Sequence, residues 1–112
     1  MGLLTNNVQE WHPAGKILRE KCRRAREYVK EKGMDMVRLA LGYALSRKEC
    51  GSVVMGMTEE WQVDLAVEVR DKGLTDEEWK VIEVLRNEER FFKNEEGWDG
   101  IEEVKKFWEG EV

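Results

Sequence analysis

The residues best suited to chemistry lie in the segment 56–62, Gly-Met-Thr-Glu-Glu-Trp-Gln, which follows the apolar run 52–55, Ser-Val-Val-Met. The glycine lets the chain turn sharply, and the hydroxyl of Thr58 can cap a helix that begins near Glu59. The first backbone N–H groups of a helix have no partner within it, so they readily bind anions such as phosphate. The segment therefore predicts an anion site, although Thr58 would cap a helix in any protein.

The histidine and the cysteines show no catalytic or metal-binding pattern. His12 is the single histidine, and it could act as a general acid or base, but no nucleophile and carboxylate can be arranged around it. A structural hydrogen bond in a loop is the favoured interpretation. Cys22 and Cys50 lack the spacing of metal ligands. Cys22 lies on an apolar helix face and is predicted to be buried, whereas Cys50 is predicted to be more exposed. We predict no catalytic residue and no metal ligand.

A group of basic residues raises the alternative of nucleic-acid binding. They are Lys16, Arg19, Lys21, Arg23, Arg24 and Arg26. The chain as a whole is acidic, with 19 basic and 24 acidic residues and a net charge of −5. An acidic chain is a poor binder of nucleic acid or of anionic membranes, so we expect neither as a partner. Because glutamates alternate with the basic residues, we expect a solvated helix face.

Helices dominate the first half of the predicted structure. Residues 1–13 are expected to form an irregular arm. Apolar residues then recur at helical spacing over 14–32, and Gly33 suits the residue just beyond a helix. Asp35 is predicted to cap a second helix, in which Gly42 would be explained by close packing against a strand.

A single strand is predicted in the second half, at 52–56, because its β-branched run is typical of a buried strand. A third helix is expected over 59–71, and Thr75 and Glu78 have the spacing of a capping box for a fourth. A further short helix is expected after Asp99. Parallel strands need neighbours. We therefore predict that the chain is one piece of a larger barrel or sheet.

The predicted organisation is a single partial domain over residues 1–112. It consists of the arm at 1–13, a helix–helix–strand–helix unit at 14–72 and a helical extension at 73–112. The 112 residues, 41% of them hydrophobic, suffice for one small domain. Without neighbouring strands, the isolated chain is expected to be a marginal helical assembly, an oligomer or an aggregate.

Three blocks of the sequence resemble the aldo/keto reductase family. They are Gly-Leu-Leu-Thr at 2–5 with Glu-Trp-His-Pro-Ala at 10–14, the helical segment Arg-Leu-Ala-Leu-Gly-Tyr-Ala-Leu at 38–45, and residues 52–62. In that family they correspond to the loop after strand seven, to outer helix seven, and to strand eight with its cofactor turn. The resemblance covers residues 2–70 and is greatest to the galactose and arabinose dehydrogenase branch. It implies an α/β fold, the C-terminal portion of a TIM (β/α)8 barrel, with one strand and four to five helices in this chain.

The resemblance implies hydride transfer but leaves the catalytic residues outside this chain. Members of the family reduce carbonyls, or oxidise alcohols and lactols, with a nicotinamide dinucleotide. Their proton donor is a tyrosine supported by lysine, aspartate and histidine, all in the first part of the barrel. Tyr28 and Tyr43 match outer helices instead, so we expect both to be packing residues.

The resemblance also implies cofactor contacts at Gly56, Met57, Thr58 and Gln62. In relatives this turn holds the phosphate on the adenosine half of NAD or NADP. The block at 2–5 resembles the loop that folds over the pyrophosphate.

Two departures from the family pattern bear on the choice of cofactor. Many relatives carry Arg or Lys in the turn when they bind the 2′-phosphate of NADP, whereas this chain carries Glu59 and Glu60, which would repel it. Leu65 and Ala66 replace a Glu-Asn pair near the adenine, which removes a polar contact.

Two functions of different class remain open. One is the C-terminal part of an NAD(P)-dependent oxidoreductase acting on sugars or other carbonyl or alcohol substrates. The alternative is a non-catalytic, helix-rich module that associates with itself or with another chain through apolar surface. The start of the sequence lacks the pattern of a signal peptide and no run is long enough to span a membrane, so a cytoplasmic location is expected.

Overall fold

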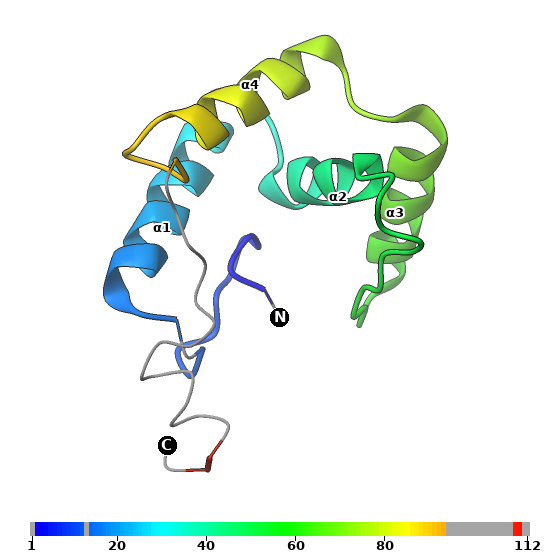
Figure 1. The fold of residues 1–112 in the computed structure, drawn as a ribbon. Helices are drawn as coiled ribbons and strands as arrows, with labels where there is room; N and C mark the ends of the chain where they lie inside the picture. Colours follow the sequence, from blue (N-terminus) through cyan, green and yellow to red (C-terminus); the bar gives the residue numbers. More distant parts are fainter. Residues whose placement is uncertain (1, 13, 94–108, 111–112) are drawn as a thin grey trace.

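The computed structural model describes residues 2–12, 14–93 and 109–110, and four helices lie within them (Figure 1). They are α1 (Lys16–Glu31), α2 (Met36–Ser46), α3 (Glu60–Lys72) and α4 (Asp76–Asn87). The central helix, α2, contacts each of the other three. In Figure 1 the N-terminal arm, in blue, extends from the start of α1 toward α2. No helix in this described part is long and apolar enough to cross a membrane.

Three helix ends form where the local sequence predicts them. Gly33 follows α1 with a φ of +72°, a conformation that glycine adopts without a steric penalty. At the start of α2 the Val37 N–H donates to Oδ1 of Asp35 at 3.0 Å. At the start of α4 the Glu78 N–H donates to the Thr75 hydroxyl at 3.2 Å, and the Thr75 N–H donates to the Glu78 carboxylate at 3.0 Å. The predictions for Gly33 and Asp35 and the predicted capping box of Thr75 and Glu78 are confirmed.

The strand predicted at 52–56 is wrong for this structure. Residues 52–58 form neither helix nor strand, and Val54 is 94% exposed. A strand is stabilised by hydrogen bonds to a neighbouring strand, and the described residues contain none that could receive them. The segment is therefore a linker between α2 and α3. The short helix predicted after Asp99 falls outside the described residues.

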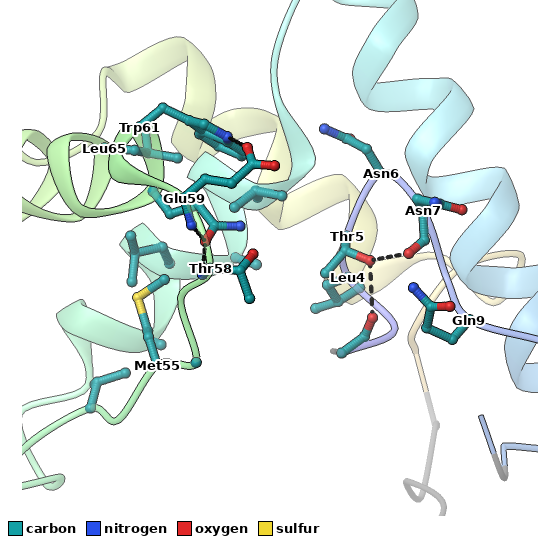
Figure 2. Close-up of a pocket in the computed structure, with 18 residues that line it drawn as sticks. Leu4, Thr5, Asn6, Asn7, Gln9, Met55, Thr58, Glu59, Trp61 and Leu65 are labelled. Carbon is teal, nitrogen blue, oxygen red and sulfur yellow. Dashed lines mark hydrogen bonds between the residues drawn. The ribbon is translucent and has the colours of Figure 1, made fainter. Parts of the chain in front are cut away.

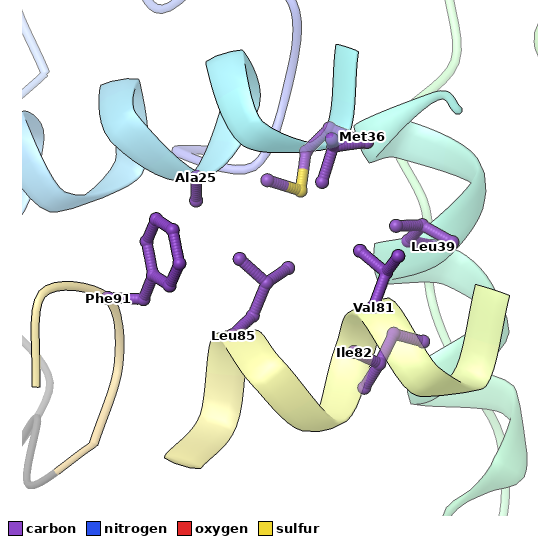
Figure 3. Close-up of a cluster of buried hydrophobic side chains, with 8 residues drawn as sticks. Ala25, Met36, Leu39, Val81, Ile82, Leu85 and Phe91 are labelled. Carbon is purple, nitrogen blue, oxygen red and sulfur yellow. The ribbon is translucent and has the colours of Figure 1, made fainter. Parts of the chain in front are cut away.

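The main core lies where α1, α2 and α4 meet (Figure 3). Its buried side chains are Ala25, Val29, Met36, Leu39, Val81, Ile82, Leu85 and Phe91. Phe91, which follows α4, is 2% exposed, and the ring of Tyr28 packs against it with centroids 5.3 Å apart. Tyr43 also packs against this core, so the predicted packing role of both tyrosines is confirmed.

The glycine inside α2 is required by close packing, but against a different partner from the one predicted. A Cβ on Gly42 would lie 2.4 Å from Cγ of Leu74, which belongs to the link between α3 and α4. The expectation of helix–strand packing is therefore wrong, because the link takes the place beside the helix. Gly42 allows this link to cross α2 closely.

One arginine ties three helices together. Nε of Arg38 on α2 lies 2.8 Å from Oε2 of Glu78 on α4, and Nη1 lies 3.5 Å from Oε1 of Glu68 on α3. Nη2 also donates to the backbone carbonyl of Gly73 at 3.3 Å. The arginine side chain is 21% exposed and that of Glu78 is 9% exposed. Removal of one partner from a pair this shielded leaves an uncompensated charge, which costs more than the loss of a surface ion pair.

Candidate functional site

A cavity of about 610 Å³ lies between the N-terminal arm and the α2–α3 region (Figure 2). One wall comes from arm residues 2–9, a second from one face of α2, and a third from linker residues 53–59 with the first turns of α3. Its volume falls within the roughly 300–1,000 Å³ that is usual for small-molecule sites. The cavity is therefore large enough to hold a small-molecule ligand.

The cavity brings together residues that lie more than 50 positions apart in the chain. Gly56, Thr58 and Gln62 line it from the α3 side, whereas Gly2 and Thr5 line it from the arm. Figure 2 shows Thr58 and Thr5 on opposite sides of the space. The two blocks that were matched separately to cofactor loops thus face one cavity.

Met57, the fourth predicted contact residue, does not line this cavity. It lines an adjacent recess of about 180 Å³ with residues such as Leu45, Val67 and Arg70. The turn thus directs Met57 to the opposite side of the linker from Thr58. A backbone contact of Met57 with a ligand stays a prediction.

The N-terminus of α3 is closed by its own side chains. The predicted cap Thr58 is wrong, because the cap residue is Glu59. The Thr58 and Glu59 backbone N–H groups both donate to Oε1 of Gln62, at 2.7 and 3.1 Å, and Glu59 and Gln62 form a capping box. The carboxamide oxygen of Gln62 thus occupies the position that an anion oxygen would take at this helix end. An anion can bind there only if the Gln62 side chain moves away.

The α3 side of the cavity carries negative charge. Glu59 and Trp61 both line the cavity, and the indole N–H of Trp61 donates to the Glu59 carboxylate (Figure 2). Glu60 follows in the first turn of the helix. Carboxylates at this position suit the helix dipole but oppose a second phosphate group on a ligand.

Arg19, on α1, binds three backbone carbonyl groups of the arm and a fourth at Ala14, just beyond it. Its Nη2 donates to the carbonyls of Gln9, Glu10 and His12, at 3.1, 3.1 and 2.6 Å. Its Nε donates to the carbonyl of Ala14 at 3.1 Å. The C-terminal end of the arm is therefore fixed to α1 by one guanidinium group.

A second arginine of α1 binds the other end of the arm, where Nη1 of Arg26 donates to the Leu3 carbonyl at 3.1 Å. The predicted solvated face is correct for Arg23, whose side chain is 48% exposed and paired with glutamates. It is wrong for Arg19 and Arg26, which are partly buried. Their spacing of seven residues places them on the same helix face as buried Cys22, and this signal in the sequence could have identified them.

His12 makes the structural hydrogen bond that was predicted for it. The Ala14 N–H donates to its Nδ1 at 3.2 Å, and its ring stacks on Trp11 with centroids 6.2 Å apart. Burial and the charge of Arg19 lower the pKa of His12 below its ordinary value of 6.5. The imidazole is therefore neutral at neutral pH, as an Nδ1 acceptor must be. Among the described residues, no group of three or more His, Cys, Asp or Glu is arranged to hold a metal ion.

Comparison with known proteins places the chain in a family. The model of the aldo/keto reductase family matches residues 1–87, which is more than half of the sequence. The chain belongs to the aldo/keto reductase family. It is 37% identical over 90 residues to the L-galactose dehydrogenase of Arabidopsis thaliana. No solved structure matches the chain significantly.

Membership of the aldo/keto reductase family confirms the family and the galactose dehydrogenase-like branch that the sequence blocks predict. It also gives the chain the ancestry of a (β/α)8 barrel. The aligned region covers 76% of this aldo/keto reductase chain but only 28% of the L-galactose dehydrogenase. Every residue that lines the cavity lies within the matched region.

Proposed function

We propose that the chain is the C-terminal, cofactor-side part of an NAD(P)-dependent oxidoreductase that acts on sugars or other carbonyl or alcohol substrates. The observation that carries this proposal is that Gly56, Thr58 and Gln62 line the same cavity as the arm block at 2–5. Membership of the aldo/keto reductase family supports it. The proton donor comes from a part of the barrel outside these 112 residues. The acidic composition and the low cysteine content suit the cytoplasm.

The cavity fits the adenosine end of a dinucleotide on one condition. The carboxamide of Gln62 must first move away. The backbone N–H groups of Thr58 and Glu59 then donate hydrogen bonds to a phosphate oxygen instead. The carboxylate of Glu59 opposes a 2′-phosphate, so NAD fits this site better than NADP. The dinucleotide, when bound, supplies the hydride donor or acceptor. The residues of this chain bind and orient its adenosine end.

The first test is the intact mass of the native polypeptide, captured from its own cells with an antibody against the C-terminal residues. A mass several-fold above 13.2 kDa is expected, because the remaining barrel is then present in the same chain. A protein of that length is then titrated with NADH and with NADPH. Trp61 lines the cavity and is 48% exposed, so its fluorescence should be quenched, more strongly by NADH.

The variant Trp61→Phe separates quenching at the cavity from quenching elsewhere, because it removes the indole beside the α3 turn. We expect the 112-residue chain alone to show no quenching at micromolar cofactor and no turnover, since most of the barrel is missing. If neither dinucleotide quenches the tryptophan fluorescence of the complete barrel, even at millimolar concentration, the proposal is overturned.

A second candidate is a non-catalytic, helix-rich module that associates with itself or with another chain. The observation that favours it is the apolar surface of the linker and of α3, where Val54 is 94%, Val63 47% and Val67 42% exposed. Exposed apolar patches of this kind mark interaction surfaces or aggregation sites. A native mass near 13.2 kDa would favour this candidate over the oxidoreductase.

A further inference from the structure

We propose that Arg19 and Arg26 are positioning residues, which fix the arm-side wall of the cavity to α1 so that it faces the α3 turn at a set distance. This inference rests on the proposed function, because it assigns the two arginines a role in dinucleotide binding. Neither touches the cavity itself. Their effect passes through the backbone of the arm.

The hydrogen bond from Arg26 acts directly behind the cavity wall. It binds the carbonyl of Leu3 at 3.1 Å, and the two neighbours of Leu3 in the chain, Gly2 and Leu4, both line the cavity. The Leu3 side chain is 9% exposed and packs in a small apolar cluster with Ala14 and Cys22. The arm is therefore held at this point by one charged hydrogen bond and one buried side chain.

Arg19 holds the opposite end of the same wall. Gln9, whose carbonyl it binds, is the last arm residue that lines the cavity. The arm forms no helix or strand over residues 2–12, so its backbone carbonyls are available to the guanidinium groups. Both arginines project from one face of α1. That helix packs with α2 and α4 in the main core, and α1 thus serves as the rigid support for the wall.

The chain offers a matched control for the loss of positive charge. Arg23 lies on α1 between the two anchors, and it binds Glu20 and Glu27 of its own helix rather than the arm. The variants are Arg19→Gln, Arg26→Gln and Arg23→Gln, made in the protein at the length found for the native polypeptide. All three remove one positive charge from the same helix, but only the first two release the arm.

The first measurement is limited proteolysis within residues 2–12, with a protease that does not cleave at arginine. Loss of a charged hydrogen bond is expected to speed cleavage there roughly tenfold in Arg19→Gln and Arg26→Gln. Cleavage within α2 and α4 should proceed at the wild-type rate in all three variants. The arm of Arg23→Gln should be cleaved at the wild-type rate as well.

The second measurement separates positioning from a general structural effect. The Kd for NADH should rise about tenfold in the two anchor variants. The Kd for AMP should stay unchanged, because AMP is short enough to contact the α3 side alone. Turnover at saturating cofactor should be retained.

Replacement by lysine gives a further distinction between the two positions. Arg26→Lys should recover most of the NADH affinity, since a single donor suffices for one carbonyl. Arg19→Lys should not, because one ammonium group cannot reach four carbonyls in the geometry of the guanidinium fork.

Two results would overturn the inference while leaving the proposed function intact. One is an arm that is cleaved equally fast in Arg26→Gln and Arg23→Gln. The other is a loosened arm with unchanged NADH affinity. If the wild-type protein itself binds no dinucleotide, the proposed function fails and the assigned role in cofactor binding fails with it. The proteolysis measurement still decides whether the arginines hold the arm.

Discussion

Gln62 places its carboxamide oxygen against the backbone N–H groups of Thr58 and Glu59, which are the donors that an anion would need. Each such hydrogen bond contributes about 0.5–1.5 kcal/mol net, so a phosphate displaces Gln62 only by forming stronger, charge-assisted bonds in its place. The residue thus determines whether this helix end acts as a cap or as a binding site.

Glu78 is a buried carboxylate that accepts hydrogen bonds from Arg38 and from the Thr75 backbone N–H. Burial raises the pKa of Glu78, but the hydrogen bond from the Thr75 backbone and the Arg38 guanidinium lower it by more, so the net pKa lies below the ordinary value of 4.5. A carboxyl group with a depressed pKa in the folded state stabilises the fold above pH 4.5, and this contribution is lost as the pH falls through the folded-state pKa.

We therefore predict that Glu78→Gln lowers the free energy of unfolding at neutral pH by about 1–3 kcal/mol, because Arg38 loses its charged partner. The variant should also lose less stability than the wild type on acidification below pH 4.5. Urea denaturation at neutral and at acidic pH measures both effects. Glu77→Gln is the matched control, since Glu77 is exposed and pairs with Lys80 of the same helix. Equal losses in the two variants would contradict the prediction.

At the scale of the elements, the link between α3 and α4 crosses α2 closely at Gly42, where Leu74 leaves no room for a Cβ. We predict that Gly42→Ala destabilises the protein. The gain in helix propensity is at most about 1 kcal/mol, whereas crowding of the Leu74 side chain costs about 1–3 kcal/mol. Denaturant unfolding of the single variants and of Gly42→Ala with Leu74→Ala forms a double-mutant cycle. The double variant should lose less stability than the sum of the two single losses, and simple additivity would show that the contact is not the cause.

The helices could be predicted from sequence because their signals are local. The cap at Asp35 and the capping box of Thr75 and Glu78 involve residues within three positions of each other, so the pattern contains both partners. The strand at 52–56 could not be predicted by the same means, since its existence depends on a neighbouring strand that the pattern does not contain. The position of the arm could not be predicted from local spacing either. Its anchors on α1 lie 10 and 23 residues away in sequence.

At the scale of the whole molecule, the linker and α3 leave apolar side chains in water. We predict that the 112-residue chain self-associates, and that Val54→Lys combined with Val67→Lys shifts it toward the monomer, because charge at these exposed positions opposes burial against a second copy. Sedimentation velocity over a concentration series measures the shift. Ile17→Lys is the control, since Ile17 is 77% exposed on α1, away from the linker. Association that persists in the double variant, or that Ile17→Lys abolishes equally, would place the contact surface elsewhere.

The sequence by itself determined the family, the four described helices, and the helix ends at Gly33, Asp35 and Thr75, because these follow from local spacing and from blocks of residues that can be compared directly. Only the tertiary structure decided that residues 2–5 and 56–62 face one cavity. It also decided that Gln62 closes the helix end and that two arginines hold the arm. The physical reason is that a long side chain can reach several backbone groups, and which of them it meets depends on packing between distant elements rather than on its neighbours in sequence.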